Sequence, residues 1–145
     1  MKVDGVTILT DPVFSEKIGI GLGPMTLGMT RIVGPALGHT EIPRPDIVLL
    51  SHAHMDHFDL PSLRALESEA TNVVTAARTS DLLRARYRSI HELAWGDSVR
   101  FGETEIQAFE VNHWGARLRS DTYRGFNGYV IETRNYRVLF GGDTA

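Results

Sequence analysis

The sequence predicts an α+β fold in a single layered domain, and the order of its segments indicates this. A short strand, a helix-forming segment, a second strand and a second helix-forming segment follow one another, and a run of short β segments comes after them. This order is typical of strands and helices packed in layers. With 145 residues, of which 42% are hydrophobic, the chain is long enough to bury one core. We therefore expect residues 1–145 to form one domain.

The first part of the chain predicts two strands separated by a long loop. Residues 5–10 are β-branched and apolar and stop at Asp11-Pro12, which is typical of a strand that enters a turn. Residues 18–45 are rich in Gly and Pro, and they predict a loop that is unusually long for a compact domain. Residues 46–51 form a continuous apolar run, which predicts a buried strand.

The rest of the chain predicts two helices and several strands. Residues 60–67 begin with Leu-Pro, and Pro is tolerated in a first helical turn. Residues 72–76 predict a strand, and residues 79–87 begin with capping residues that predict a second helix. Short β segments separated by turn residues then follow at 92–95, 98–101, 104–111, 128–133 and 137–140.

Composition excludes several classes of function. The net charge of −3 and the lack of a long basic run give no support for binding nucleic acid. Since the chain has no cysteine, disulfide scaffolds, cysteine zinc sites and thiol catalysis are excluded. The N-terminal residues contain no export signal, which favours the cytoplasm, and no segment approaches the length of a transmembrane helix.

Residues 50–59, LSHAHMDHFD, place three of the six histidines and two aspartates directly after the predicted buried strand. His52 and His54 project the same way from an extended segment, so they can reach one metal ion. Asp56 and His57 can then bind an adjacent ion. Zinc accepts both imidazole nitrogen and carboxylate oxygen. Because the ligand set contains no thiolate, Mn or Fe also suits it.

Two residues further along the chain can complete this pair of sites. A catalytic zinc ion usually has three protein ligands, and His113, just past a predicted strand, is the natural third ligand beside His52 and His54. Asp143 follows the strand at 137–140 and two glycines. One carboxylate that bridges two cations about 3.5–4 Å apart is a recurring feature of two-metal hydrolases.

The order His52-x-His54-x-Asp56-His57, then His113, then Gly142-Asp143 resembles the metallo-β-lactamase superfamily. The segments ILTDPVFSE, IPRPDIVLLSHAHMDHFD, NHWGAR, NGYVIE and LFGGDT are similar to the branch that includes the N-acyl-phosphatidylethanolamine phospholipase D-like enzymes and the ascorbate-phosphate lactonase-like proteins. The resemblance implies that His52, His54 and His113 bind one zinc ion, and that Asp56, His57 and a bridging Asp143 bind a second. It also implies that Asp11 orients a ligand, although an Asp before Pro is also a common turn former.

The resemblance implies a four-layer αβ/βα sandwich, of which this chain resembles mainly the first αβ half. The family has a further histidine after the Gly-Asp strand, so we expect a metallo-β-lactamase-like domain truncated at its C-terminus. Half of such a sandwich exposes an apolar sheet face, which predicts a homo-oligomer that covers this face.

The resemblance implies a metal-dependent hydrolase whose two zinc ions activate water against an ester-type bond, with Asp56 able to handle the proton. The expected substrate is a small-molecule or lipid-like ester, in particular a phosphodiester or a lactone. The alternative from another class is a non-catalytic metal-binding or interaction module, or an inactive fragment.

Overall fold

A mostly parallel sheet carries the first part of the chain in the computed structural model, which describes residues 1–22 and 25–144. Its strands lie in the order β1-β2-β5-β6-β7, and all neighbours are parallel except β1 and β2. Their bounds are Lys2–Val3, Val6–Thr10, Ile47–Leu49, Ser68–Ala76 and Tyr87–Leu93. Ile47, Val48 and Leu49 are all buried, as expected where both faces of a parallel sheet are covered.

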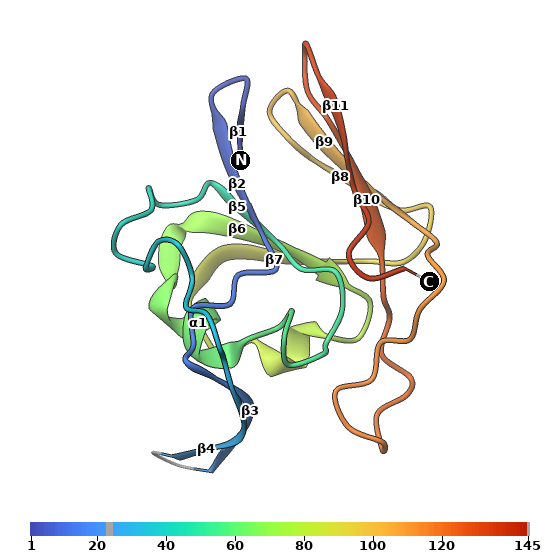
Figure 1. The fold of residues 1–145 in the computed structure, drawn as a ribbon. Helices are drawn as coiled ribbons and strands as arrows, with labels where there is room; N and C mark the ends of the chain where they lie inside the picture. The colour runs from blue at the N-terminus through green and yellow to red at the C-terminus, as the bar shows by residue number, and fades with distance from the viewer. Residues whose placement is uncertain (23–24, 145) are drawn as a thin grey trace.

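A second, antiparallel sheet follows, with the strand order β11-β10-β9-β8. The bounds of these strands are Ser98–Phe101 for β8, Thr104–Phe109 for β9, Gly128–Glu132 for β10 and Arg137–Phe140 for β11. The segments predicted at 98–101 and 137–140 coincide with β8 and β11. The two sheets lie face to face (Figure 1). Between them lies a core that includes Ile8, Leu49, Val74, Ile106 and Ile131.

A thin helical layer covers the other face of the first sheet. Helix α1 (Leu60–Ala65) begins at Asp59, whose carboxylate accepts a hydrogen bond from the Ser62 amide and caps the helix. Leu63 of α1 packs with Val48, Val73 and Phe58 in a second core. The layers are therefore helix, sheet and sheet, and strand residues far outnumber helical residues in the described chain.

The helix predicted at 79–87 is wrong. Only the 3-10 helix η1 (Ser80–Leu82) forms there, and Tyr87 already begins β7. The carboxylate of Glu92 on β7 accepts hydrogen bonds from the Thr79 and Ser80 amides, and Tyr87 pairs with Ser68 of β6. Pairing with the sheet therefore overrides the local helix signal.

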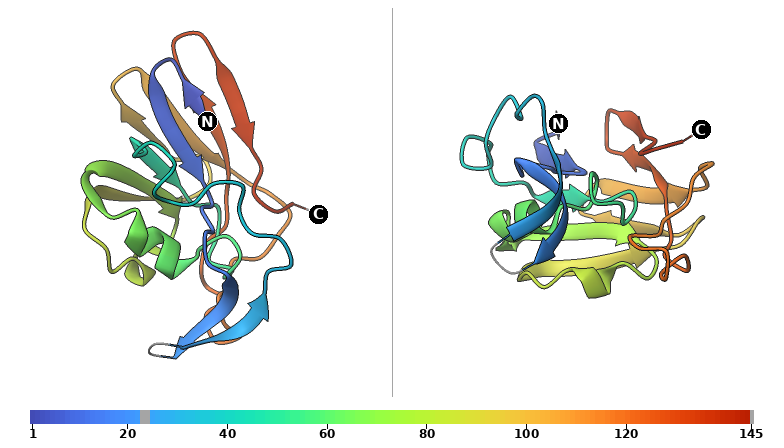
Figure 2. Two further views of the ribbon diagram at one scale, coloured as in Figure 1. Left: turned by 60° about the vertical axis from the view of Figure 1, so that its left-hand side comes forward. Right: turned by 60° about the horizontal axis from the view of Figure 1, so that its bottom comes forward.

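The long loop predicted at 18–45 is wrong in its first part. Strands β3 (Lys17–Leu22) and β4 (Met25–Thr30) pair as a two-stranded hairpin, which projects from the two sheets (Figures 1 and 2). Residues 23 and 24 of the predicted loop lie outside the described residues. From Arg31 to Asp46 the chain forms no helix or strand, so this part of the expectation holds.

Strand direction brings the predicted site residues to one edge. β2 and β5 are parallel, so Asp11 and the segment that begins at Leu50 follow neighbouring carboxyl ends. β9 and β11 are both antiparallel to β10, so the segments that follow them also leave from a common edge. The two edges meet where the Asn127 amide donates a hydrogen bond of 2.9 Å to the Ser51 carbonyl.

Candidate metal centre

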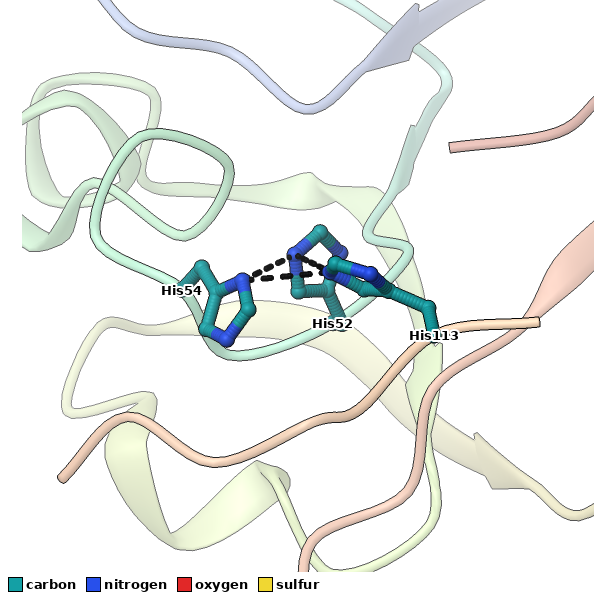
Figure 3. A group of neighbouring side chains, drawn as sticks. All are labelled: His52, His54 and His113. Atoms are coloured by element: carbon teal, nitrogen blue, oxygen red, sulfur yellow. Dashed lines mark hydrogen bonds between the residues drawn. The ribbon is translucent and has the colours of Figure 1, made fainter. Parts of the chain in front are cut away.

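Three imidazole nitrogens face one another at the junction of the sheets (Figure 3). His52 Nε2 lies 2.8 Å from His54 Nδ1, and His113 Nε2 lies 3.2 Å from each of them. Three mutually close nitrogens cannot all be joined by N–H···N hydrogen bonds, because each nitrogen is either a donor or an acceptor. A shared cation resolves this conflict. Zn–N bonds of about 2.0–2.1 Å place the nitrogens of a tetrahedral site about 3.3 Å apart, so the cluster fits a metal ion.

Burial keeps two of these rings neutral. It lowers the pKa of His52 from its ordinary 6.5 to about 2, and the nearby imidazoles of His57 and His54 contribute. Burial also lowers the pKa of His54, with a further contribution from His113. Neutral imidazole is the form that binds metal, so the site does not have to lose protons from these two rings before it binds.

The hydrogen-bond network determines which nitrogen of His52 carries its proton. The Ser51 hydroxyl donates to Asp11 Oδ2 at 2.5 Å, and Ser51 Oγ lies 2.8 Å from His52 Nδ1. Since that hydroxyl proton is already donated, His52 Nδ1–H donates to Ser51 Oγ, and the lone pair of Nε2 points into the cluster. For His54 the roles are reversed: its Nδ1 faces the cluster, and its Nε2 points away (Figure 3).

His57 belongs to a second group. Its Nδ1 lies 2.7 Å from Asp11 Oδ2, and its Nε2 lies 3.2 Å from Asp143 Oδ1 and 4.0 Å from Asp56 Oδ2. Burial alone would lower the pKa of His57, but the hydrogen bond to Asp11 and the charges of Asp11, Asp143 and Asp56 raise it above its ordinary value. A proton and a metal ion therefore compete for Nε2.

Asp143 lies between the two groups. One carboxylate oxygen is 3.2 Å from His57 Nε2, and the other is 3.9 Å from His113 Nε2. Its position depends on Gly142, which has a φ of +59°. A Cβ atom on Gly142 would lie 2.6 Å from the Ser51 Cβ, so the chain approaches Ser51 closely just before Asp143.

Asp11 is close enough to His52 and His57 to form a metal-binding group with them. Both of its oxygens, however, already accept hydrogen bonds from the Ser51 amide, the Ser51 hydroxyl and His57 Nδ1. Asp11 therefore orients these side chains from the side opposite Asp143. Its φ of +38° lies in the left-handed region, which aspartate tolerates better than most residues do.

All seven predicted site residues, Asp11, His52, His54, Asp56, His57, His113 and Asp143, lie at this junction. Two further contributors lie in segments that resemble the family, but the sequence predicts no role for them. Ser51 links Asp11 to His52, and the Arg117 guanidinium donates hydrogen bonds to the carbonyls of Ala53 and Phe58. Trp114 packs its ring edge to face on His54, with the ring centroids 4.8 Å apart.

Residues 6–145 match the family model described as the β-lactamase superfamily domain. This chain belongs to the β-lactamase superfamily. It is 32% identical to the mitochondrial N-acyl-phosphatidylethanolamine-hydrolyzing phospholipase D of Saccharomyces cerevisiae, over 97% of this chain and 31% of that protein. It is also 32% identical to a metal-dependent hydrolase of Exiguobacterium sp., over 99% of this chain and 58% of that protein.

Solved structures show the same fold. An isothiocyanate hydrolase from Delia radicum gut bacteria superposes with a TM-score of 0.70 at 19% identity, over all of this superfamily member and 59% of that chain. The diiron β-hydroxylase CmlA of Streptomyces venezuelae superposes with a TM-score of 0.63 at 22% identity, over 97% of this chain and 26% of that one. The chain thus spans between about a third and three fifths of the length of the curated relatives described above.

The metallo-β-lactamase fold is therefore confirmed, and the predicted αβ/βα sandwich is confirmed only in part, because helices are few. None of the helices in the described residues is both long and apolar enough to cross a lipid bilayer.

Proposed function

We propose that this chain carries the metal-binding site of a hydrolase, with two zinc ions as its cofactors. The position of Asp143 carries this proposal, because one of its oxygens lies 3.2 Å from His57 Nε2 and the other lies 3.9 Å from His113 Nε2 in the three-histidine cluster. His52, His54 and His113 would hold the first ion, and Asp56, His57 and Asp143 the second. The bound ions would lower the pKa of a water molecule and polarise the oxygen of the substrate.

The protein's own residues then have distinct roles. The imidazoles of His52 and His57 are each held in one tautomer, by Ser51 and Asp11 respectively, which reduces the reorganisation that binding requires. The side chain of Asp56 is 60% exposed and lies beside His57. It can therefore accept a proton from a water molecule of the solvent. Trp114, 54% exposed and packed on His54, can form an apolar wall for a substrate.

The substrate that we propose is an ester, with a phosphodiester first and a lactone second. The yeast relative is named for the hydrolysis of a phospholipid, N-acyl-phosphatidylethanolamine, which supports a lipid-like phosphodiester. The name of the Exiguobacterium relative supports metal-dependent hydrolysis but specifies no substrate. Iron remains an alternative metal, since the diiron protein CmlA shares the fold.

Metal content and turnover test this proposal together. We expect the zinc-reconstituted chain to hold two ions per chain by mass spectrometry of the metal. Asp143→Asn and His54→Ala should each lower this number, whereas His39→Ala, an exposed histidine outside the site, should not. Turnover of bis(p-nitrophenyl) phosphate by the metal-loaded chain, or by a longer protein that contains it, would identify a hydrolase.

Two results would contradict the proposal. Full metal content in Asp143→Asn would show that Asp143 does not join two ions. Two bound ions without turnover of phosphodiesters or lactones, in this chain and in a longer one, would instead favour the non-catalytic metal-binding module.

A further inference from the structure

Arg117 joins the two segments that carry the three clustered histidines. Its Nη1 donates a hydrogen bond of 2.8 Å to the Phe58 carbonyl and one of 3.2 Å to the Ala53 carbonyl. Ala53 lies between His52 and His54, and Phe58 directly follows His57. Arg117 itself follows His113 by four positions, so one guanidinium links segments that are about 60 residues apart in sequence.

The two carbonyls are the ends of one tight turn. Within it the His54 carbonyl accepts hydrogen bonds from the amides of His57, at 3.1 Å, and Phe58, at 2.7 Å. The turn thus presents His54, Asp56 and His57. By bonding to the carbonyls at both ends, a single guanidinium nitrogen holds the turn closed.

The segment that carries Arg117 is itself held in place by the rest of the fold. At Gly115 a Cβ atom would lie 2.3 Å from the Gly125 carbonyl oxygen, so the backbone there packs directly on residues 124 and 125. The Gly125 amide in turn donates a hydrogen bond of 2.8 Å to the Ala77 carbonyl, just beyond β6. Arg117 therefore extends from a segment that is fixed independently of the histidine turn.

The hydrogen bonds of Arg117 act on the backbone of the turn and not on its side chains. Arg117 is half-buried, and its charge is costly to bury unless its donors are satisfied by strong acceptors. Its Nη1 has no carboxylate partner within the part of the chain that the structure describes, and both of its hydrogen bonds go to main-chain carbonyls. Such bonds restrain backbone position, which a change of side chain on the turn would not alter.

We propose that Arg117 is a positioning residue that holds the turn between Ala53 and Phe58 against the His113 segment and so sets the geometry of the three-histidine cluster. This inference rests on the proposed function, because it assumes that the cluster binds metal. Its consequence is that metal affinity depends on a residue that touches neither a metal ligand side chain nor substrate.

Zinc affinity and a spectroscopic signature test the proposal. We expect Arg117→Ala to raise the zinc dissociation constant about tenfold or more, measured by competition with a chromogenic chelator. The visible absorption of the cobalt-substituted variant should also change, because the ligand nitrogens no longer hold their relative positions. Arg117→Lys should recover part of the loss, since an ammonium group can donate to one carbonyl but lacks the planar guanidinium. Arg119→Ala, exposed and two residues further on, is the matched control and should leave the affinity and the spectrum unchanged.

Hydrogen exchange in the metal-free protein separates this proposal from the proposed function. Faster exchange of the His57 and Phe58 amides in Arg117→Ala, with global thermal unfolding little changed, supports the positioning role even if the wild type binds no zinc and the proposed function fails. Wild-type exchange at these amides together with wild-type zinc affinity in Arg117→Ala would overturn it. If Arg117→Ala does not fold, both measurements are made on Arg117→Lys. Wild-type values of the amide exchange, the zinc affinity and the cobalt spectrum in that variant would overturn the proposal.

Discussion

At the scale of single residues, Asp11 shows how much one carboxylate organises. Three donors converge on its two oxygens: the Ser51 amide, the Ser51 hydroxyl and His57 Nδ1. Through Ser51 it also determines which nitrogen of His52 carries a proton. Asp11 thus acts on both groups of ligands while each of its oxygens already accepts a hydrogen bond.

Asp11→Asn should therefore weaken metal binding without unfolding the chain. Asparagine tolerates the positive φ of Asp11, but it offers one carbonyl oxygen to three donors. We expect affinity for the ion at His57 to fall about 10–100-fold, as measured by zinc titration. Asp4→Asn is the matched control, because Asp4 also has a positive φ, of 45°, and lies between β1 and β2, where its carboxylate accepts hydrogen bonds from Thr133 and Asn135 and from no residue of the site. An equal loss in both variants would show that the hydrogen bonds of Asp11 are not responsible.

The sequence allows much of the site to be predicted at this scale, and the reason is spacing. His52, His54, Asp56 and His57 lie within one short segment, so their proximity needs no knowledge of the fold. Ser51 and Arg117 carry no such signal. Their contributions depend on hydrogen bonds to partners that are distant in sequence, which only the three-dimensional structure shows.

At the scale of elements, the predicted helices and strands are correct where the local sequence signal and the pairing of strands in the sheets agree. They fail at the hairpin because Gly-rich segments are unusual in strands. Gly19 and Gly28 lie opposite each other in β3 and β4, and a Cβ on either would lie within 2.6 Å of the Cα of the other. The same glycines that indicate a loop are thus required for this close pairing.

The two glycines after β11 should respond differently to substitution, because only one is constrained. Gly142→Ala introduces a Cβ close to Ser51 at a positive φ, which costs about 1–2 kcal/mol from the backbone alone. It should also displace Asp143 and lower the number of zinc ions per chain. At Gly141 a Cβ meets nothing within 4 Å, so Gly141→Ala should retain both stability and metal content. Similar effects of both variants, measured by thermal unfolding and metal analysis, would contradict this assignment.

The connection between β9 and β10 is held by an ion-pair network that predicts a pH dependence. Asp121 accepts hydrogen bonds from the Leu118 amide and from Arg124 Nε, each at 2.7 Å. Burial alone would raise the pKa of Asp121, but these bonds hold it below its ordinary 3.8. A lowered pKa stabilises the fold above about pH 4, and this contribution is lost as the pH falls through the folded-state value.

Asp121→Asn should accordingly destabilise the chain by about 1–3 kcal/mol near neutral pH, measured by urea unfolding. The difference in unfolding free energy from the wild type should narrow as the pH falls below the ordinary pKa of 3.8 towards the lower pKa that Asp121 has in the folded state. In an Arg124→Gln background the effect of Asp121→Asn should shrink, because the two residues act as a pair. A gap that stays constant between pH 7 and pH 3 would exclude the charge of Asp121 as its cause.

At the scale of the whole molecule, the outer face of the second sheet differs from the apolar face that the sequence predicts. Arg100 pairs with Glu105, and Arg137 pairs with Glu132, so one row across the sheet is charged. The apolar part of the face includes Leu139, which is 70% exposed. A homo-oligomer that covers this face stays a prediction. The apolar area that is available for such a contact is smaller than the sequence implies.

The two sheets are joined near the site by Tyr129 of β10. Its hydroxyl is fully buried, donates a hydrogen bond of 2.9 Å to the Leu50 carbonyl, and accepts one of 3.1 Å from Asn127 Nδ2. Leu50 directly precedes the segment that carries the histidines. This hydroxyl therefore connects the core between the sheets to the base of the metal centre.

Tyr129→Phe should lower the free energy of unfolding by about 1–3 kcal/mol, because it leaves a buried carbonyl and a buried amide without this partner. Tyr136→Phe is the control, since Tyr136 is 59% exposed and its hydroxyl makes no hydrogen bond within the described residues. Zinc content should be unchanged in both variants, because neither hydroxyl touches the candidate ligands. Loss of zinc in Tyr129→Phe without loss of stability would instead mean that the hydroxyl acts on the site itself and contributes little to joining the two sheets.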